Sequence, residues 1–193
     1  MDKFSNKLQK LLTGDRPVTL QVIVDNFSEK SFGILFLLLL TIPSLPLPTG
    51  GITHIFEIVA ILLALELISG RKAVWLPKKW LNKTLPNSLQ TSALPKFIKI
   101  IRWIEKYSHL RSVSIQNNSL LPRLVGLVVL VFTIFAFLAP PFSGLDTLPS
   151  LGVVLLSLSF IFDDLFLSFI GIIVGVIGIG LLLLLGKLAF ALL

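Results

Sequence analysis

The chain of 193 residues contains no cysteine, a single methionine and few charged residues. Without cysteine it cannot form a disulfide, a thiolate metal site or a cysteine nucleophile. Charged residues make up 14% of the sequence, whereas hydrophobic residues make up 54%. A water-soluble chain of this length cannot bury so much apolar surface. The composition therefore favours a membrane protein.

Charge is absent from four long stretches, namely residues 31–56, 124–145, 147–162 and 165–186. A helix needs about 20 apolar residues to cross the hydrocarbon core of a bilayer, so these stretches predict membrane segments. Residues 165–185 form the clearest single transmembrane helix. Small residues within it favour tight helix packing, either inside the protein or across a homodimer. These residues are Gly171, Gly175, Gly178 and Gly180.

Most of the net charge of +7 lies in residues 70–123, which hold eleven Lys and Arg residues and one acid, Glu105. Basic loops face the cytoplasm, so this linker and the amphipathic N-terminus, residues 1–31, are both expected there. Within the linker, residues 95–108 follow helical spacing, with cations opposite an apolar arc. Such a helix lies on anionic lipid head groups or packs on the protein's own cytoplasmic surface. Nucleic acid is not an expected partner, because every cationic cluster adjoins an apolar span.

Two apolar hairpins, residues 32–69 and 124–162, are each interrupted by proline and glycine, which break helices. An offset of 94 residues aligns the two interruptions, pairing Pro46 with Pro140, Gly50 with Gly144 and Thr53 with Thr147. The residues expected to break the helices are Pro43, Pro46, Pro48, Gly50, Gly51, Pro140, Pro141 and Gly144. This correspondence predicts that the hairpins are structural repeats.

The first arm, residues 32–42, is too short to cross a bilayer, because eleven helical residues span about 16 Å. The break that follows it is therefore expected at membrane depth, buried in protein or lining a wet cavity. Interrupted segments in two halves mark the central site of many transporters, but plain hairpin corners have the same composition. A linker that stays cytoplasmic gives parallel repeats, whereas a re-entrant break gives inverted ones.

These features together predict an all-α integral membrane protein with a single membrane domain, residues 1–193. It comprises two repeated, Pro-broken helical hairpins, a basic linker, a C-terminal transmembrane helix and interfacial amphipathic helices. No Gly-rich phosphate loop, Gly-x-Ser-x-Gly elbow or zinc-binding His pair occurs, so the chain is not expected to be an enzyme or to carry a cofactor.

Glu57 lies inside the second apolar arm, where an ionised carboxylate costs about 2.5 to 3.5 kcal/mol. His54 lies one turn earlier on the same helix face, so the pair could share a proton or hold a cation. Alternatively, Glu57 caps the broken backbone. The candidate polar site comprises His54, Glu57, Thr49, Thr53, Ser143, Asp146 and Thr147. Its oxygen atoms suit a proton or a hard cation, and no transition-metal site is expected.

Three further acids are expected to have structural roles. Glu66 is close enough along the helix to form an ion pair with Arg71. Asp163 and Asp164 lie between two apolar segments, where we expect a salt-bridge cluster at the interface opposite the basic linker.

The segments "FGILFLLLLTIPSLPLPTGG", "LISGRKAVWLPKKWLNK" and "LAPPFSGLDTLPSLGVVLLSLSFIFDD" resemble the ExoD family. The likeness runs from about residue 14 to residue 185, and its most specific part is Gly70, Arg71, Trp75, Leu76 and Pro77. The resemblance implies a multi-pass protein of the bacterial inner membrane, linked by its family name to exopolysaccharide synthesis. It supplies no catalytic residues.

Three hypotheses follow for the function. The first is a pathway for an ion, a proton or a small solute between the two halves, which predicts that His54, Glu57 and Asp146 converge. The second is a membrane scaffold that binds other polysaccharide synthesis proteins through its basic face. The third is a membrane enzyme that acts on a lipid-linked sugar.

Overall fold

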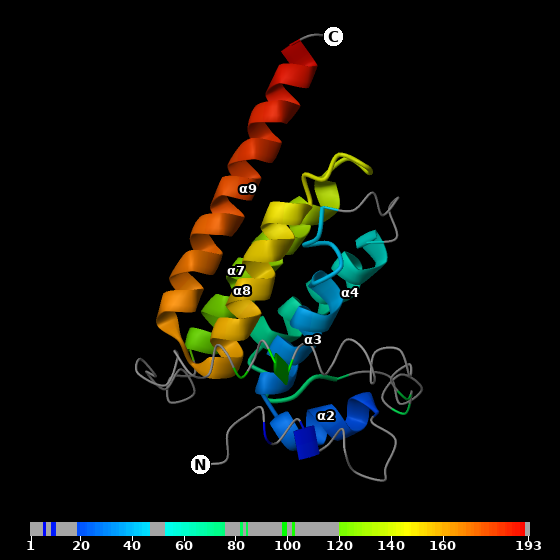
Figure 1. Ribbon diagram of the computed structural model, residues 1–193, viewed down its shortest axis with the longest axis vertical. Coiled ribbons are helices and arrows are strands. Elements are labelled where there is room, and N and C mark those ends of the chain that lie inside the picture. Colours follow the sequence, from blue (N-terminus) through cyan, green and yellow to red (C-terminus); the bar gives the residue numbers. More distant parts are fainter. Residues whose placement is uncertain are drawn as a thin grey trace.

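The computed structural model describes residues 19–46, 53–75 and 120–191, together with residues 6, 9, 10, 82, 84, 98, 99 and 102. The helices are α2 (Leu20–Phe27), α3 (Lys30–Leu40), α4 (Thr53–Ile68), α7 (Leu120–Leu138), α8 (Thr147–Phe162) and α9 (Leu165–Ala191) (Figure 1). Within these residues there is no β-strand, although Thr19 and Thr84 form an isolated antiparallel bridge. The all-helical prediction is confirmed.

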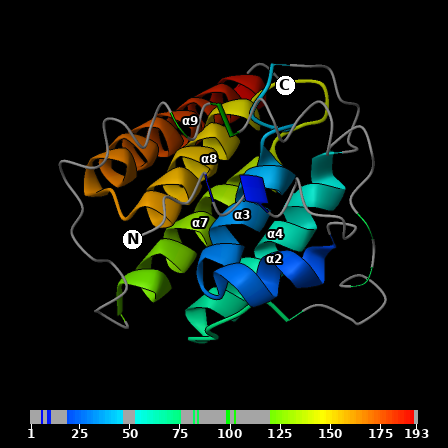
Figure 2. The ribbon, with the colours of Figure 1, turned by 60° about the horizontal axis from the view of Figure 1, so that its bottom comes forward.

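The helices α3, α4, α7 and α8 form a bundle, and within it each helix packs against two of the other three. Both α3 and α7 contact α4 on one side and α8 on the other. Helix α9 packs along α8, on the flank of the bundle that is farther from α4 (Figure 2). The core between the helices is apolar and includes Phe32, Phe36, Leu40, Leu67 and Leu156.

The two hairpins enter the bundle from the same end. The turns that follow α3 and α7, residues 41–46 and 139–146, lie together at one end of the bundle, which we name the corner end (Figure 1). The start of α3 and the end of α8 lie at the other end, named the linker end, beside α2. Helices α3 and α7 therefore run in the same direction, as parallel halves would.

The second helices of the two hairpins match in length, and each hairpin packs closely against the other, although α7 is longer than α3. Helices α4 and α8 are both 16 residues long, and they begin 94 residues apart, at Thr53 and Thr147. At Gly33 of α3 an added Cβ would lie 3.1 Å from the Ser157 carbonyl of α8, and at Gly126 of α7 it would lie 3.3 Å from the Ala64 carbonyl of α4. These correspondences favour related halves, and a duplication stays a prediction.

The bundle presents apolar side chains outward as well as inward. On α4 the exposed residues include Ile55, Ile58, Leu62 and Leu65, and on α7 they include Leu124, Leu127, Val131 and Ile134. Residues Leu120–Leu138 and Leu165–Leu188 are long and apolar enough to cross a membrane. Their length and composition agree with the membrane class expected from the sequence.

Three helix bounds differ from the sequence prediction, because a charge ends an apolar stretch without ending a helix. Helix α3 begins at Lys30, α7 begins at Leu120 and includes Arg123, and α9 continues beyond Lys187 to Ala191. Each of these cations lies within one or two turns of a helix end. A charge at a helix end reaches solvent easily, so it costs little there.

Helix α9 packs tightly on α8 through glycine, as its sequence predicts. An added Cβ at Gly152 of α8 would lie 2.8 Å from Gly175 Cα, and one at Gly175 would lie 2.0 Å from the Phe132 ring. Gly171 and Gly178 also meet α8, whereas Gly180 faces open space. The close contacts are therefore within the chain, along the first two thirds of α9.

Two predicted amphipathic segments are described only in part. Part of the amphipathic N-terminus forms α2, with Val24 and Phe27 buried. In the segment 95–108, Ile98 is buried whereas Lys99 and Arg102 are exposed, and the rest of that segment lies outside the described residues.

Candidate functional site

Glu57 lies on the stripe of α4 that faces the interior of the bundle. The buried residues of this helix are Thr53, Glu57, Ala60, Leu63, Ala64 and Leu67, which follow helical spacing. The Glu57 side chain is 0% exposed, one turn from the start of the helix. A carboxylate therefore occupies a core position in an apolar bundle.

The two oxygens of the Glu57 carboxylate have different surroundings. Oε2 lies 2.8 Å from Nδ1 of His54, whose side chain is 24% exposed and reaches the surface. Oε1 is buried and has no hydrogen-bond partner among the described residues. An unpaired buried polar atom costs about 1–3 kcal/mol, so this arrangement is unfavourable for packing alone.

Asp146, from the second hairpin, lies beside this pair at the corner end. It is half-buried just before α8, and its side chain forms a hydrogen bond with Thr53. It is also close enough to His54 and to Glu57 for their charges to interact. The structure therefore brings together Thr53, His54, Glu57 and Asp146, from both hairpins.

The other predicted site residues lie apart from this group or outside the described residues. Ser143 is exposed and closes its own turn, since its Oγ donates to the Pro140 carbonyl at 2.6 Å and accepts from the Leu145 amide at 3.2 Å. Thr147 is half-buried as the first residue of α8. Thr49 lies outside the described residues.

The predicted helix breakers form turns between separate helices. Pro43 is buried and Pro46 exposed in the first turn, and Pro140, Pro141 and Gly144 are exposed in the second. Gly144 has φ +67, a left-handed conformation that favours glycine. Pro48, Gly50 and Gly51 lie outside the described residues. In the described part, the breaks are corners of hairpins, and a helix broken within one span stays a prediction.

Ser150 is a polar residue at this end that the sequence reasoning missed. It lies in the first turn of α8, is 0% exposed, and its Oγ has no hydrogen-bond partner in the described part of the chain. Glu57 Oε1 is likewise buried without a hydrogen-bond partner among the described residues. A serine in an uncharged stretch gives no signal by itself, and only the burial of this one distinguishes it.

Glu66 differs from its predicted role. Its Oε2 accepts a hydrogen bond from the Trp75 backbone amide at 2.9 Å, while the Arg71 guanidinium lies over the Trp75 ring, 5.6 Å from its centroid. The predicted ion pair with Arg71 is replaced by these two contacts. Gly70, with φ +83, turns the chain back, which brings the Trp75 amide to the carboxylate.

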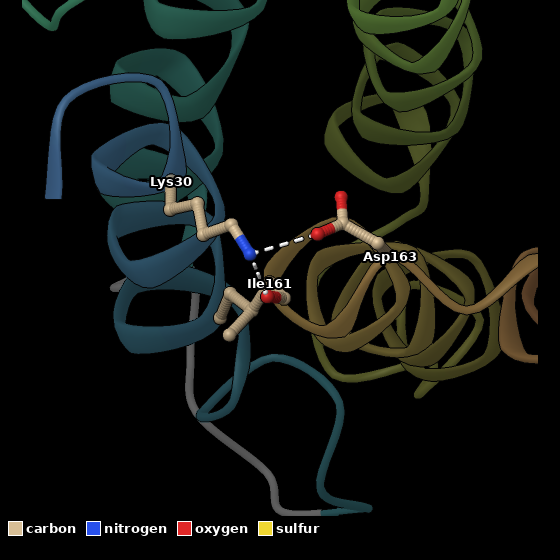
Figure 3. A network of polar contacts seen from close by, with 3 residues as sticks. All are labelled: Lys30, Ile161 and Asp163. Atoms are coloured by element: carbon tan, nitrogen blue, oxygen red, sulfur yellow. Dashed lines mark hydrogen bonds and ion pairs between the residues drawn. The ribbon is translucent and has the colours of Figure 1, made fainter. Parts of the chain in front are cut away.

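Asp163 and Asp164 lie at the linker end, not opposite it as predicted. Lys30 Nζ donates to Asp163 Oδ2 at 2.9 Å and to the Ile161 carbonyl at 2.7 Å (Figure 3). Asp164 Oδ1 accepts from the Phe166 amide at 2.9 Å, which caps the start of α9. Of these two acids, only Asp163 forms an ion pair with a described residue. Helix α8 returns the chain to the end where α3 begins, and this brings Asp163 to Lys30.

Within the described residues, no three His, Asp or Glu side chains are grouped as the ligands of a metal ion are. The grouping at the corner end consists of one imidazole in contact with one carboxylate, and a second carboxylate nearby. Such a group can accept, hold and release a proton.

Comparison with known proteins connects the chain to one family. A family model described as "Exopolysaccharide synthesis, ExoD" matches residues 4–184. An uncharacterized protein of Synechocystis sp. is 29% identical over 167 residues, which cover 86% of this chain and 77% of that protein. Protein ExoD of Rhizobium meliloti is 28% identical over 151 residues, which cover 76% of this chain and 61% of that protein. No solved structure matches the chain. The family model covers nearly the whole sequence, and the chain therefore belongs to the ExoD family of exopolysaccharide synthesis proteins.

Proposed function

We propose that this protein is a multi-pass protein of the bacterial inner membrane that moves protons through a site made of His54, Glu57 and Asp146. The movement would support exopolysaccharide synthesis, with which the family is associated. The observation that carries the proposal is the wholly buried Glu57 carboxylate, which has one oxygen on His54 and the other without a hydrogen-bond partner among the described residues.

The charges around Glu57 favour a proton over a fixed ion pair. Among the described residues, His54 and Asp146 are the titratable groups that lie close enough to interact with it. The charged residues of the packed helices α3, α7 and α8 lie at the other end, namely Lys30, Arg123 and the Asp163 that follows α8. His54 is therefore the only group among these that could supply a positive charge beside Glu57.

The position of His54 provides a route to the buried carboxylate. Its ring is partly exposed at the corner end and lies 5.3 Å from the Phe137 ring of α7. A proton taken up at the imidazole can pass to Glu57 Oε2 across 2.8 Å. Oε1 and the Ser150 hydroxyl, both buried and without hydrogen-bond partners in the part of the chain that the structure describes, extend polar groups into the bundle from α4 and α8.

The exterior of the bundle supports the membrane location. Exposed side chains of α4, α7 and α9 are largely apolar, which suits acyl chains better than water. The N-terminal segment and the linker meet through the Thr19–Thr84 bridge and a hydrogen bond between Gln9 and Arg102. Since the linker is strongly basic, we place both in the cytoplasm.

A scaffold is the second candidate function. It is favoured by the second hairpin turn, where Ser143 bonds to the backbone of its own turn and does not join the polar group around Glu57. In this reading the exposed cations of the linker, such as Lys72 and Lys99, bind partner proteins of polysaccharide synthesis. Homodimers and anionic lipid head groups are further proposed partners.

Proton flux into liposomes tests the first candidate. The full chain is reconstituted with a trapped pH-sensitive dye, and a potassium diffusion potential drives proton entry. We expect Glu57→Gln to lower the flux at least tenfold. Glu66→Gln, the same change on the same helix at the linker end, serves as the control and leaves the flux unchanged. Flux through Glu57→Gln equal to that of the unaltered chain would overturn the proposal, as would a chain no more conductive than empty liposomes.

A further inference from the structure

The guanidinium of Arg123 lies against the backbone of Gly70, where α4 ends. Gly70 has φ +83, and an added Cβ there would lie 2.7 Å from Nη2 and 3.1 Å from Nε of Arg123. Arg123 belongs to the first turns of α7, so two helices from different hairpins meet here, at the linker end of the bundle. We name this place the Gly70 junction. Arg71 follows Gly70 directly in the chain, so both arginines adjoin Gly70.

Two of the acids described at this end have partners other than Arg123. Glu66 accepts from the Trp75 amide, and Asp163 accepts from Lys30. The structure gives Arg123, which is exposed, no carboxylate partner among the described residues. Arg71 Cζ lies over the Trp75 ring, 5.6 Å from its centroid. Among the described residues the Gly70 junction carries the cations Arg71, Lys72 and Arg123 against the carboxylate of Glu66, so positive charge is in excess there.

A guanidinium recognises the oxygens of phosphate through paired N–H donors, which suits it to this ligand better than a lysine amine. The positive end of the α7 dipole adds to the attraction, since Arg123 lies near the N-terminus of that helix. Trp75 is 63% exposed beside the arginines. Tryptophan next to basic residues is typical of the level of lipid head groups.

The apolar surface that begins at the Gly70 junction indicates which kind of molecule carries the phosphate. Leu65 on α4 and Leu124 on α7 are exposed within about one turn of Gly70 and Arg123, on the side of the corner end. A lipid bound by its phosphate at the arginines can therefore lay its acyl chains along these helices. A free phosphate ion would gain nothing from that surface.

We propose that Arg123 and Arg71, at the Gly70 junction between α4 and α7, bind the phosphate of an anionic phospholipid at the cytoplasmic face. This inference rests on the membrane location in the proposed function and does not depend on proton movement.

Thermal unfolding of the full chain in a neutral detergent tests the site. Phosphatidylglycerol should raise the Tm more than phosphatidylcholine does, and inorganic phosphate should leave the Tm unchanged. Arg123→Gln should weaken the apparent affinity for phosphatidylglycerol at least fivefold, as expected when one cation near a membrane surface is lost. Arg123→Lys, which keeps the charge and loses the paired donors, should give an intermediate result. Lys187→Gln removes the same charge near the other end of the molecule and serves as the control.

Each result has a definite meaning for the site. Because the shift is measured within each variant, a lower starting Tm of Arg123→Gln does not affect the comparison. An unchanged affinity in both Arg123→Gln and Arg71→Gln would overturn the proposal, and so would an equal loss in Lys187→Gln. An equal shift with inorganic phosphate would overturn the lipid as the ligand. Glu57→Gln should keep the lipid effect, so failure of proton flux and failure of this site are distinguishable.

Discussion

Lys30, the first residue of α3, and Asp163, which follows α8, form an ion pair between the two hairpins with Nζ 2.9 Å from Oδ2. The same amine donates to the Ile161 carbonyl, one of the last acceptors of α8, where the helix dipole favours a cation (Figure 3). At the opposite end, Thr53 and Asp146 form a second polar contact between the hairpins. The halves are thus joined by polar contacts at both ends of an apolar interface.

Loss of the Lys30 amine should destabilise the fold more than loss of the Asp163 charge. Asp163 has φ 55, a conformation that asparagine also tolerates, so Asp163→Asn removes the charge without backbone strain. We expect Asp163→Asn to cost about 1 kcal/mol of unfolding free energy and Lys30→Met about 2 kcal/mol, since the latter also leaves a carbonyl unpaired. Thermal unfolding in detergent measures both. If the double variant loses the sum of the two effects, the residues are not coupled.

The contact between α8 and α9 should not tolerate a methyl group at Gly152. A Cβ there would lie 2.8 Å from Gly175 Cα, and backbone cannot move aside as a flexible side chain can. We expect Gly152→Ala to cost about 1–3 kcal/mol of stability. Gly180→Ala is the matched control on α9, because nothing lies within 4 Å of that position. Equal Tm values for the two variants would contradict the close helix contact.

Replacing Glu57 should separate stability from activity. Glu57→Met removes a buried charge whose Oε1 has no partner in the described structure, so the Tm should rise or stay the same while proton flux is lost. His54→Ala should have the opposite effect on stability, because it leaves the carboxylate buried without its imidazole. A Tm that falls sharply in Glu57→Met would show that the carboxylate stabilises the bundle.

The chain has no cysteine, so single introduced thiols can report its orientation without further changes. Thr84→Cys, at an exposed position of the linker, should react with an impermeant maleimide only from the cytoplasmic side. Ser143→Cys, exposed at the corner end, should react from the other side and more slowly. The slower reaction is expected because α8, which begins just after Ser143, has 16 residues and is about 24 Å long, shorter than the hydrocarbon core of a bilayer. Reaction of both thiols from one side would overturn the assigned topology.

The sequence predicted those features that depend on local spacing. His54 and Glu57 are three residues apart, so any helix places them on one face, and the alignment of the two halves placed Asp146 near them. The apolar stretches likewise identified α3, α4, α7, α8 and α9, although charged helix ends were missed. These predictions needed only the helical repeat and the distribution of charge.

The remaining features depend on contacts between segments distant in sequence. The position of Arg123 against Gly70 requires α7 to lie beside the end of α4, and the pairing of Lys30 with Asp163 requires α3 to lie beside α8. Ser150 and Ser157 both lie in the same uncharged stretch, yet Ser157 bonds the carbonyl of Val153 in its own helix, whereas Ser150 has no hydrogen-bond partner among the described residues. No periodicity in a single sequence specifies which helices become neighbours.

The unequal lengths of the helices make the hydrophobic belt of this molecule taller on one flank than on the other. Helix α9 has 27 residues and is about 40 Å long, whereas the 16 residues of α4, on the opposite flank, reach about 24 Å (Figure 1). In the membrane location that we propose, lipids beside α9 would keep the ordinary thickness of a bilayer, whereas lipids beside α4 would thin to match a shorter helix. The proposed location therefore implies a gradient of bilayer thickness across the molecule.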